Sequence, residues 1–184
     1  KVPAVEVVIA TTDNPSDDSL YSYLVEKGEL VYRGSENDVL DRFICAAEYY
    51  GFDSIIRICS DNPFLDVESL IELRKVAEVS PDADYIGFQV NGTPSILTHF
   101  GFWGEYVTLD ALKKVRRITD DKKAHEHVTY YIYSHPEIFD CQWLDTPDYL
   151  EGRDDIRLTI DTMKDLQIAR NIHQELSVAL DNYG

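Results

Sequence analysis

The chain has 184 residues, of which 34 are Asp or Glu and 17 are Lys or Arg, so its formal net charge is −17. This acidic balance excludes a broad nucleic-acid interface, which needs a basic footprint. Hydrophobic residues make up 44% of the chain, too many for a disordered acidic tail, and no apolar run approaches the roughly 18 residues of a membrane span. We therefore expect one globular domain over residues 1–184 that binds neither nucleic acid nor membrane.

Strand and helix patterns alternate along the first half of the chain. The β-branched run Val5–Ala10 predicts a buried strand that ends in turn residues. Apolar residues at helical spacing after Ser16 predict a helix that ends at Gly28. The expected elements that follow are a strand over Leu30–Tyr32, a helix over Asp38–Tyr50, a strand over Ile55–Cys59, a helix over Val67–Val79 and a strand over Asp84–Phe88.

The second half of the chain is less regular. Residues 91–106 are rich in Gly, Thr and aromatic residues, and residues 120–148 carry His, Tyr and Pro with weak periodicity. We interpret this part as an antiparallel insertion that covers a ligand or forms a dimer contact. A late strand is expected over Ile156–Ile160 and a helix over Met163–Leu176. The alternation predicts a three-layer α/β domain around a mostly parallel sheet.

Two carboxylates follow predicted strands of similar sequence. Asp61 follows Arg57–Ser60, and Asp161 follows Arg157–Ile160. In open α/β sheets ligands bind at the carboxyl ends of strands, so two central parallel strands would bring these side chains together. Two oxygen ligands suit Mg²⁺, which would bridge an acidic protein to a nucleoside triphosphate. The alternative is structural, with Asp61 starting a turn before Pro63 and Asp161 capping the next helix.

Five motifs occur in one order along nearly the whole chain. They are Ile9–Asn14, Val31–Ser35 with Asp38–Arg42, Arg57–Pro63, Glu126–Thr129 and Arg157–Thr162. Together they closely resemble the cytidylyltransferase family, which includes acylneuraminate and CMP-sugar-acid synthetases, and in particular its spore-coat-polysaccharide branch. The resemblance implies a Rossmann-like, GT-A-like nucleotidyltransferase fold. It also implies a Mg²⁺-dependent enzyme that couples CTP to a sugar acid and releases pyrophosphate in surface-polysaccharide synthesis.

The resemblance also assigns roles to individual residues. Asp61 and Asp161 resemble the magnesium-binding pair of the family and are our candidate catalytic residues. Glu126 and His127 fall in a recurring segment on the sugar side or at the subunit contact. Glu105, the one charge among neighbouring aromatic residues, is a further candidate for the sugar pocket. The implied nucleotide-pocket residues are Arg33, Gly34, Ser35, Asp38, Arg42 and Asn62.

The cysteines and the N-terminal residues of the chain indicate its cellular compartment. Cys45, Cys59 and Cys141 match neither a disulfide framework nor a metal motif, so we expect reduced thiols. Residues 1–5 lack the apolar segment and cleavage site of an export signal. We expect a cytoplasmic protein and, from the family resemblance, a homodimer.

Family members open with a strand, a phosphate-binding loop and a helix before the strand that starts here at Val5. The 184 residues contain no counterpart of that segment. Either the segment lies outside this sequence, or the protein is a non-catalytic remnant that binds a nucleotide or a partner. A polypeptide truly limited to these residues is expected to be unstable or to rely on a partner strand. The alternatives among enzymes are another sugar nucleotidyltransferase and a GT-A glycosyltransferase.

Overall fold

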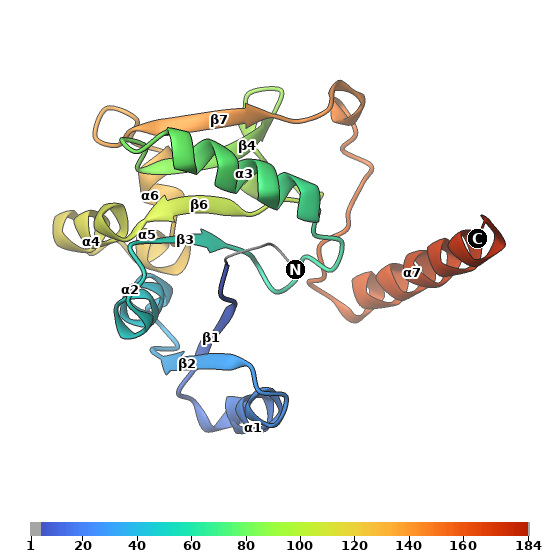
Figure 1. The fold of residues 1–184 in the computed structure, drawn as a ribbon, viewed down its shortest axis with the longest axis horizontal. Helices are drawn as coiled ribbons and strands as arrows, with labels where there is room; N and C mark the ends of the chain where they lie inside the picture. The colour runs from blue at the N-terminus through green and yellow to red at the C-terminus, as the bar shows by residue number, and fades with distance from the viewer. Residues whose placement is uncertain (1–4, 184) are drawn as a thin grey trace.

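The computed structural model describes residues 5–183, with side chains up to residue 177. Residues 1–4, on which most of the export-signal prediction rests, lie outside this range. The N-terminal part forms a two-stranded parallel sheet (Figure 1). It contains β1 (Val8–Thr12), η1 (Pro15–Asp17), α1 (Asp18–Glu26) and β2 (Leu30–Gly34).

The larger sheet is mixed. Its strands are β3 (Ser54–Arg57), β4 (Tyr85–Val90), β5 (Thr93–Pro94), β6 (Glu105–Thr108) and β7 (Cys141–Asp145). The order is β3–β6–β4–β5, and β7 pairs with β4 in parallel. Three of the five strand pairings in the described chain are antiparallel, so the prediction of a mostly parallel sheet is wrong. Two of these pairings are made by β6, which begins within the irregular stretch interpreted as an antiparallel insertion and lies between β3 and β4, antiparallel to both; the third joins β4 to β5.

Helices cover both faces of the larger sheet. The helical elements after β2 are α2 (Val39–Tyr50), α3 (Val67–Val79), η2 (Ser95–Leu97), α4 (Leu109–Ile118), α5 (Lys122–Glu126), α6 (Tyr130–Tyr133), η3 (Asp148–Leu150) and α7 (Met163–Tyr183). Successive strand residues point to opposite faces. Tyr85 therefore packs with α2, α4, α5 and α6, whereas its neighbour Ile86 packs with α3. The predicted three-layer arrangement is confirmed.

The helix boundaries follow from capping chemistry. Helix α3 has the predicted bounds, and the carboxylate of Asp66 accepts from two backbone N–H groups of its first turn. Asp38 caps α2 by accepting from the N–H of Asp41 at 2.8 Å. Gly51 ends α2 in the left-handed region, with φ of 74°, where a residue without Cβ is favoured. These short-range signals were readable from the sequence.

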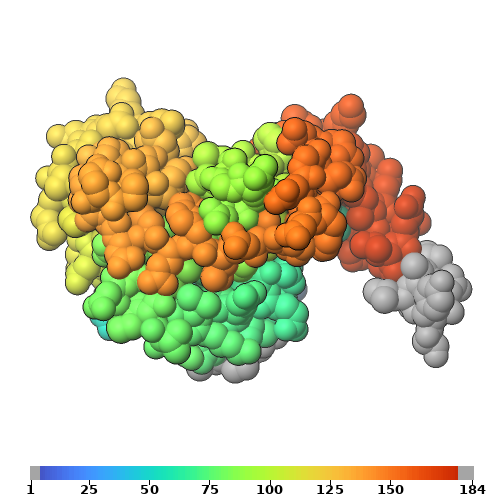
Figure 2. All heavy atoms as spheres, turned by 90° about the horizontal axis from the view of Figure 1, so that it is seen from above, coloured from blue at the N-terminus to red at the C-terminus, as the bar shows by residue number. Residues whose placement is uncertain are grey.

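The predicted strand over Ile156–Ile160 is wrong. The N–H of Leu158 donates to the carbonyl of His99 at 2.8 Å, and the N–H of Ile160 donates to the carbonyl of Asp61 at 2.9 Å. Because these carbonyls belong to two different loops, the segment crosses between them and forms no strand ladder. Helix α7 follows and extends away from the body (Figures 1 and 2). Within the described residues, no helix has the length and apolar character needed to cross a bilayer.

Candidate functional site

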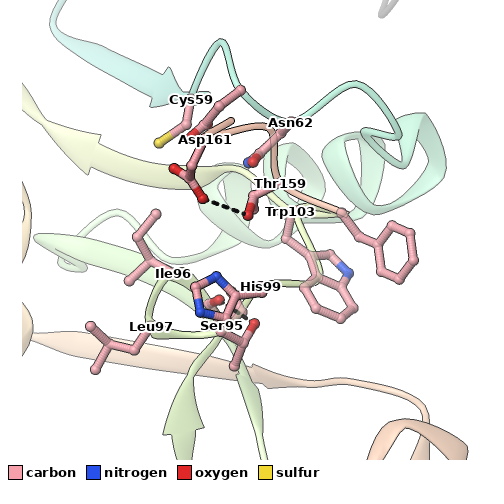
Figure 3. A pocket seen from close by; sticks show the side chains of 13 residues that line it. Cys59, Asn62, Ser95, Ile96, Leu97, His99, Trp103, Thr159 and Asp161 are labelled. Carbon is pink, nitrogen blue, oxygen red and sulfur yellow. Dashed lines mark hydrogen bonds between the residues drawn. The ribbon is translucent and has the colours of Figure 1, made fainter. Parts of the chain in front are cut away.

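A pocket of about 170 Å³ lies where β3 and β6 leave the larger sheet. One wall is the loop after β3, with Cys59, Asp61 and Asn62. The other walls are residues 95–99 and residues 101–103, and Thr159 and Asp161 close the remaining side. Figure 3 shows Asp161, Thr159, Asn62 and His99 around the hollow, with Trp103 beside it. Polar groups from segments far apart in the sequence thus meet at one place.

Asp61 lines this pocket, and one of its carboxylate oxygens is buried. Its Oδ1 is inaccessible to solvent and has no hydrogen-bond partner among the described residues. The turn here is closed by the backbone instead, since the N–H of Asn62 donates to the carbonyl of Cys59 at 3.2 Å. The structural alternative for Asp61, a turn-forming side chain, therefore leaves this oxygen unexplained. A buried unpaired carboxylate oxygen is costly unless a ligand completes it.

Asp161 faces the same pocket from the segment before α7. Its carboxylate forms an ion pair with Arg157, and Thr159 Oγ1 donates to it at 3.4 Å (Figure 3). The capping role considered for Asp161 belongs to its neighbours. Asp165 accepts from the N–H of Thr162 at 2.8 Å, while Thr162 Oγ1 accepts from the N–H of Asp165 at 3.3 Å. This reciprocal cap leaves the Asp161 side chain outside the helix terminus.

Asp61 and Asp161 meet through loops rather than through two strand ends. The hydrogen bond from Ile160 N–H to the Asp61 carbonyl joins the two segments directly. Gly101 permits this close packing: its φ is 68°, and a Cβ there would lie 3.0 Å from Asn62 Oδ1. Both residues therefore line one pocket, although the strand predicted over Ile156–Ile160 is absent.

The donor set fits a hard divalent cation. Within the described part of the chain, no cluster of three or more His, Cys, Asp or Glu side chains is arranged to hold a metal. The protein would therefore supply Asp61 and Asp161, leaving the other positions to water or to phosphate oxygens, as Mg²⁺ commonly requires. The unpaired Oδ1 of Asp61 matches this role. Asp161 would have to share its carboxylate with Arg157, which now contacts it.

Arg33 lies away from this pocket and holds the loop after β1. Its Nε donates to the carbonyl of Thr12 at 2.8 Å, and an NH2 group donates to the carbonyl of Asn14 at 2.9 Å. The same guanidinium pairs with Asp18 at 2.7 Å. These contacts fix the backbone that follows the first strand.

The other residues of that motif form a closed loop before α2. Asp38 N–H donates to Ser35 Oγ at 3.0 Å, and Arg42 donates to the Ser35 carbonyl at 2.8 Å. A Cβ at Gly34 would lie 3.1 Å from Arg42 Cγ. The Nε of Arg42 is buried and has no partner among the described residues, and burial lowers the pKa of this guanidinium. None of the motif's residues lines the pocket of Asp61.

The candidates for the sugar side lie elsewhere. Glu126 and His127 are exposed at the end of α5 and do not line the pocket. Glu105 is only 2% exposed and belongs to a hydrogen-bonded cluster inside the sheet. His125, the neighbour of Glu126, bonds Asp38 Oδ2 at 2.8 Å and the Thr119 carbonyl at 3.0 Å. Burial by itself would lower the pKa of His125, but these two acceptors outweigh it and raise the pKa.

Several pocket residues were missed by sequence reasoning. Ser95, Thr98 and His99 come from the irregular insertion, and their only signal was a polar loop between apolar runs. Thr159 was assigned to a strand interior. Cys59 lies two residues before Asp61, and burial raises the pKa of its thiol. Cys45, Cys59 and Cys141 are all free thiols.

Comparison with known proteins identifies relatives of the whole chain. A family model described as cytidylyltransferase matches residues 1–182. The uncharacterized protein MJ1063 of Methanocaldococcus jannaschii is 39% identical over 163 residues, which are 89% of this chain and 63% of that protein. The spore coat polysaccharide biosynthesis protein SpsF of Bacillus subtilis is 35% identical over 170 residues, 92% of this chain and 67% of SpsF. The chain thus spans less than two thirds of the Methanocaldococcus protein.

Solved structures agree with this likeness. A cytidylyltransferase from Leptospira borgpetersenii has a TM-score of 0.75 at 27% identity, covering 87% of this chain and 65% of that one. A CMP:2-keto-3-deoxy-manno-octonic acid synthetase, solved in complex with CTP, has a TM-score of 0.65 at 11% identity. It covers 93% of this chain and 81% of that one. At that identity the second likeness concerns the fold alone.

Proposed function

Because the chain belongs to the cytidylyltransferase family, we propose that its protein couples CTP to a sugar acid and releases pyrophosphate, with Mg²⁺ as the required ion. The observation that carries the proposal is one pocket lined by both Asp61 and Asp161, together with the buried Oδ1 of Asp61, which lacks a partner among the described residues. The layered α/β fold and the likeness to a synthetase complexed with CTP support a Rossmann-like nucleotidyltransferase. The 35% sequence identity to SpsF, a spore coat polysaccharide biosynthesis protein, supports a role in surface-polysaccharide synthesis.

The proposed reaction is a substitution at phosphorus. A hydroxyl oxygen of the sugar acid attacks the α-phosphorus of CTP and loses its proton to solvent or a nearby base. A new sugar oxygen–phosphorus bond forms, and the bond to the β-phosphate oxygen breaks to release pyrophosphate. Such a transfer depends on in-line positioning and charge neutralisation rather than on a covalent nucleophile.

The chain's own residues would divide these tasks. Asp61 and Asp161 would hold Mg²⁺, which supplies positive charge between an acidic protein and the phosphates. Asn62 and Thr159 would hydrogen bond to polar groups of a substrate in the pocket, and Trp103 would form an apolar wall. Thr159 already donates to Asp161 and so orients that carboxylate.

The test is CTP-dependent pyrophosphate release by the intact protein with a panel of sugar acids, comparing wild type with Asp161→Asn. We expect turnover that requires Mg²⁺ and falls strongly in the variant. Unchanged turnover in Asp161→Asn would refute the metal assignment. Turnover with nucleotide sugars instead of CTP would indicate a glycosyltransferase. No turnover with any triphosphate by a folded protein would indicate a non-catalytic remnant.

A further inference from the structure

A buried ion pair lies where β3 and β6 continue into two walls of the pocket. Arg57 and Glu105 form the last register pair of the β3–β6 ladder, and their side chains meet at 2.7 Å while only 14% and 3% exposed. Two residues beyond Arg57 the chain lines the pocket at Cys59. Two residues before Glu105 it lines the pocket at Trp103. The ion pair therefore sits at the point from which both walls leave the sheet.

Glu105 also binds two hydroxyl groups with its other oxygen. Tyr85 Oη donates to Glu105 Oε1 at 2.7 Å, and Thr129 Oγ1 donates to the same oxygen at 2.9 Å. Tyr85 lies on β4, whereas Thr129 precedes α6 and follows the segment that contains Glu126 and His127. One carboxylate thus links β6, which carries it, to β3 through Arg57, to β4 through Tyr85, and to the segment before α6 through the buried Thr129.

The protonation states favour this arrangement. Burial raises the pKa of Tyr85 well above its usual range, and the charge of Glu105 raises it further, so the phenol keeps the proton that it donates. Burial alone would lower the pKa of Arg57, but the neighbouring carboxylate outweighs it, so the guanidinium stays charged. A buried ion pair whose oxygens accept further hydrogen bonds costs less to desolvate, and it fixes geometry more strictly than apolar packing.

We propose that Glu105 is a positioning residue that holds the Asp61 loop and the Gly101–Trp103 wall in the geometry needed to bind the divalent cation and the nucleotide. It acts through Arg57, without touching the ligands. This inference rests on the proposed function for its catalytic consequence, but its structural part can be tested without any substrate.

Three backbone amides report on the wall geometry directly. The N–H groups of Asn62, Asp66 and Ile160 donate to the carbonyls of Cys59, Phe102 and Asp61. Glu105→Gln keeps the side-chain shape but removes the charge opposite Arg57. In the intact protein without ligands, we expect hydrogen exchange of these three amides to become at least about tenfold faster relative to amides of α2.

The second readout is the Mg²⁺ concentration that gives half-maximal CTP turnover. We expect Glu105→Gln to raise it about tenfold, the scale on which residues behind metal ligands act. The matched control is Val115→Ala, which removes core packing in α4, where Val115 is fully buried. Because a lower folded fraction reduces the amount of enzyme but not its half-saturation, the control should lose stability without either shift.

The outcomes separate the two proposals. If the three amides and the half-saturation in Glu105→Gln change no more than in Val115→Ala, the positioning role is refuted. If the amides exchange faster but wild type turns over no CTP, the positioning role stands and the proposed function fails. Should Glu105→Gln not fold, Arg57→Lys takes its place, because it keeps the charge but loses the planar guanidinium. Smaller shifts in the same direction support the role, and unchanged values refute it.

Discussion

Replacing Asp61 with Asn should stabilise the protein while it impairs the proposed reaction. The Oδ1 atom of Asp61 is buried without a partner among the described residues. Leaving a buried polar group unpaired costs about 1–3 kcal/mol, and more when it is charged. Asn has the same shape without the charge, so Asp61→Asn should raise the free energy of unfolding by about 1–2 kcal/mol. For a chain of this size that corresponds to roughly 2–8 °C in melting temperature.

The same substitution removes a proposed metal ligand. We expect CTP turnover to fall by at least about 100-fold, because even groups behind a metal ligand are worth about 10–100-fold. Asp161→Asn is the matched control, since its side chain is 50% exposed and paired with Arg157. Breaking an exposed pair costs at most about 1 kcal/mol. This control should therefore lose turnover without gaining stability.

The two expected effects are measured by calorimetric melting of the ligand-free variants and by pyrophosphate release from CTP with the same preparations. A higher melting temperature for Asp61→Asn, beside an unchanged or lower one for Asp161→Asn, would support the assignment of the unpaired oxygen to a ligand. The reasoning is refuted if Asp61→Asn melts no higher than wild type, or if it turns over CTP normally.

Three further predictions concern stability and protonation. Thr162→Ala should cost about 1 kcal/mol in urea unfolding because it removes the cap of α7, and Thr162→Ser should not; equal losses would contradict the cap. Asp17 accepts from Thr11 and Thr12, which lowers its pKa from 3.8 to about 2. The contribution of Asp17 to folding stability is therefore present above pH 3.8 and lost as the pH falls toward 2. In Asp17→Asn the urea midpoint should therefore change less with pH between those two values than in wild type. A midpoint that still falls as in wild type would exclude this source. The pKa of His125 is raised above 6.5 in the folded protein. Its contribution to folding stability is therefore complete below pH 6.5 and lost as the pH rises through the raised pKa of the folded state. NMR titration should show the raised pKa in wild type and a lower one in Asp38→Asn, and equal values would contradict the pairing.

Local signals in the sequence predicted α1, α2, α3 and the start of α7, but not the helices α4, α5 and α6 of the irregular second half. The periodicity of Val67–Val79 and the left-handed glycine at Gly51 are properties of a few neighbouring residues, so they needed no knowledge of the fold. The direction of β6 was not predictable in the same way. It depends on which strands lie on either side of β6, and those partners are distant in the sequence. Leu158 and Ile160 likewise have strand-like side chains, but their N–H groups bond to loops.

For the candidate site, too, the sequence indicated the residues with local signals and not those whose partners are distant in the chain. Asp61 and Asp161 stood out because short motifs flank them, and the structure brings both to one pocket. The charge of Glu105 suggested a ligand contact, yet the side chain is buried against Arg57. Nothing local distinguishes an inward carboxylate from an outward one when the donors come from β3, β4 and the segment before α6.

The crossing segment before α7 makes the meeting of Asp61 and Asp161 depend on a few loop contacts. Backbone hydrogen bonds to His99 and Asp61 hold this segment, and it belongs to no strand ladder. It can therefore open without disturbing the sheet, at a free energy below that of global unfolding. Opening would carry Asp161 away from Asp61 and take the site apart, while closing would restore it. The integrity of the candidate site therefore depends on the local stability of this segment rather than on the stability of the sheet.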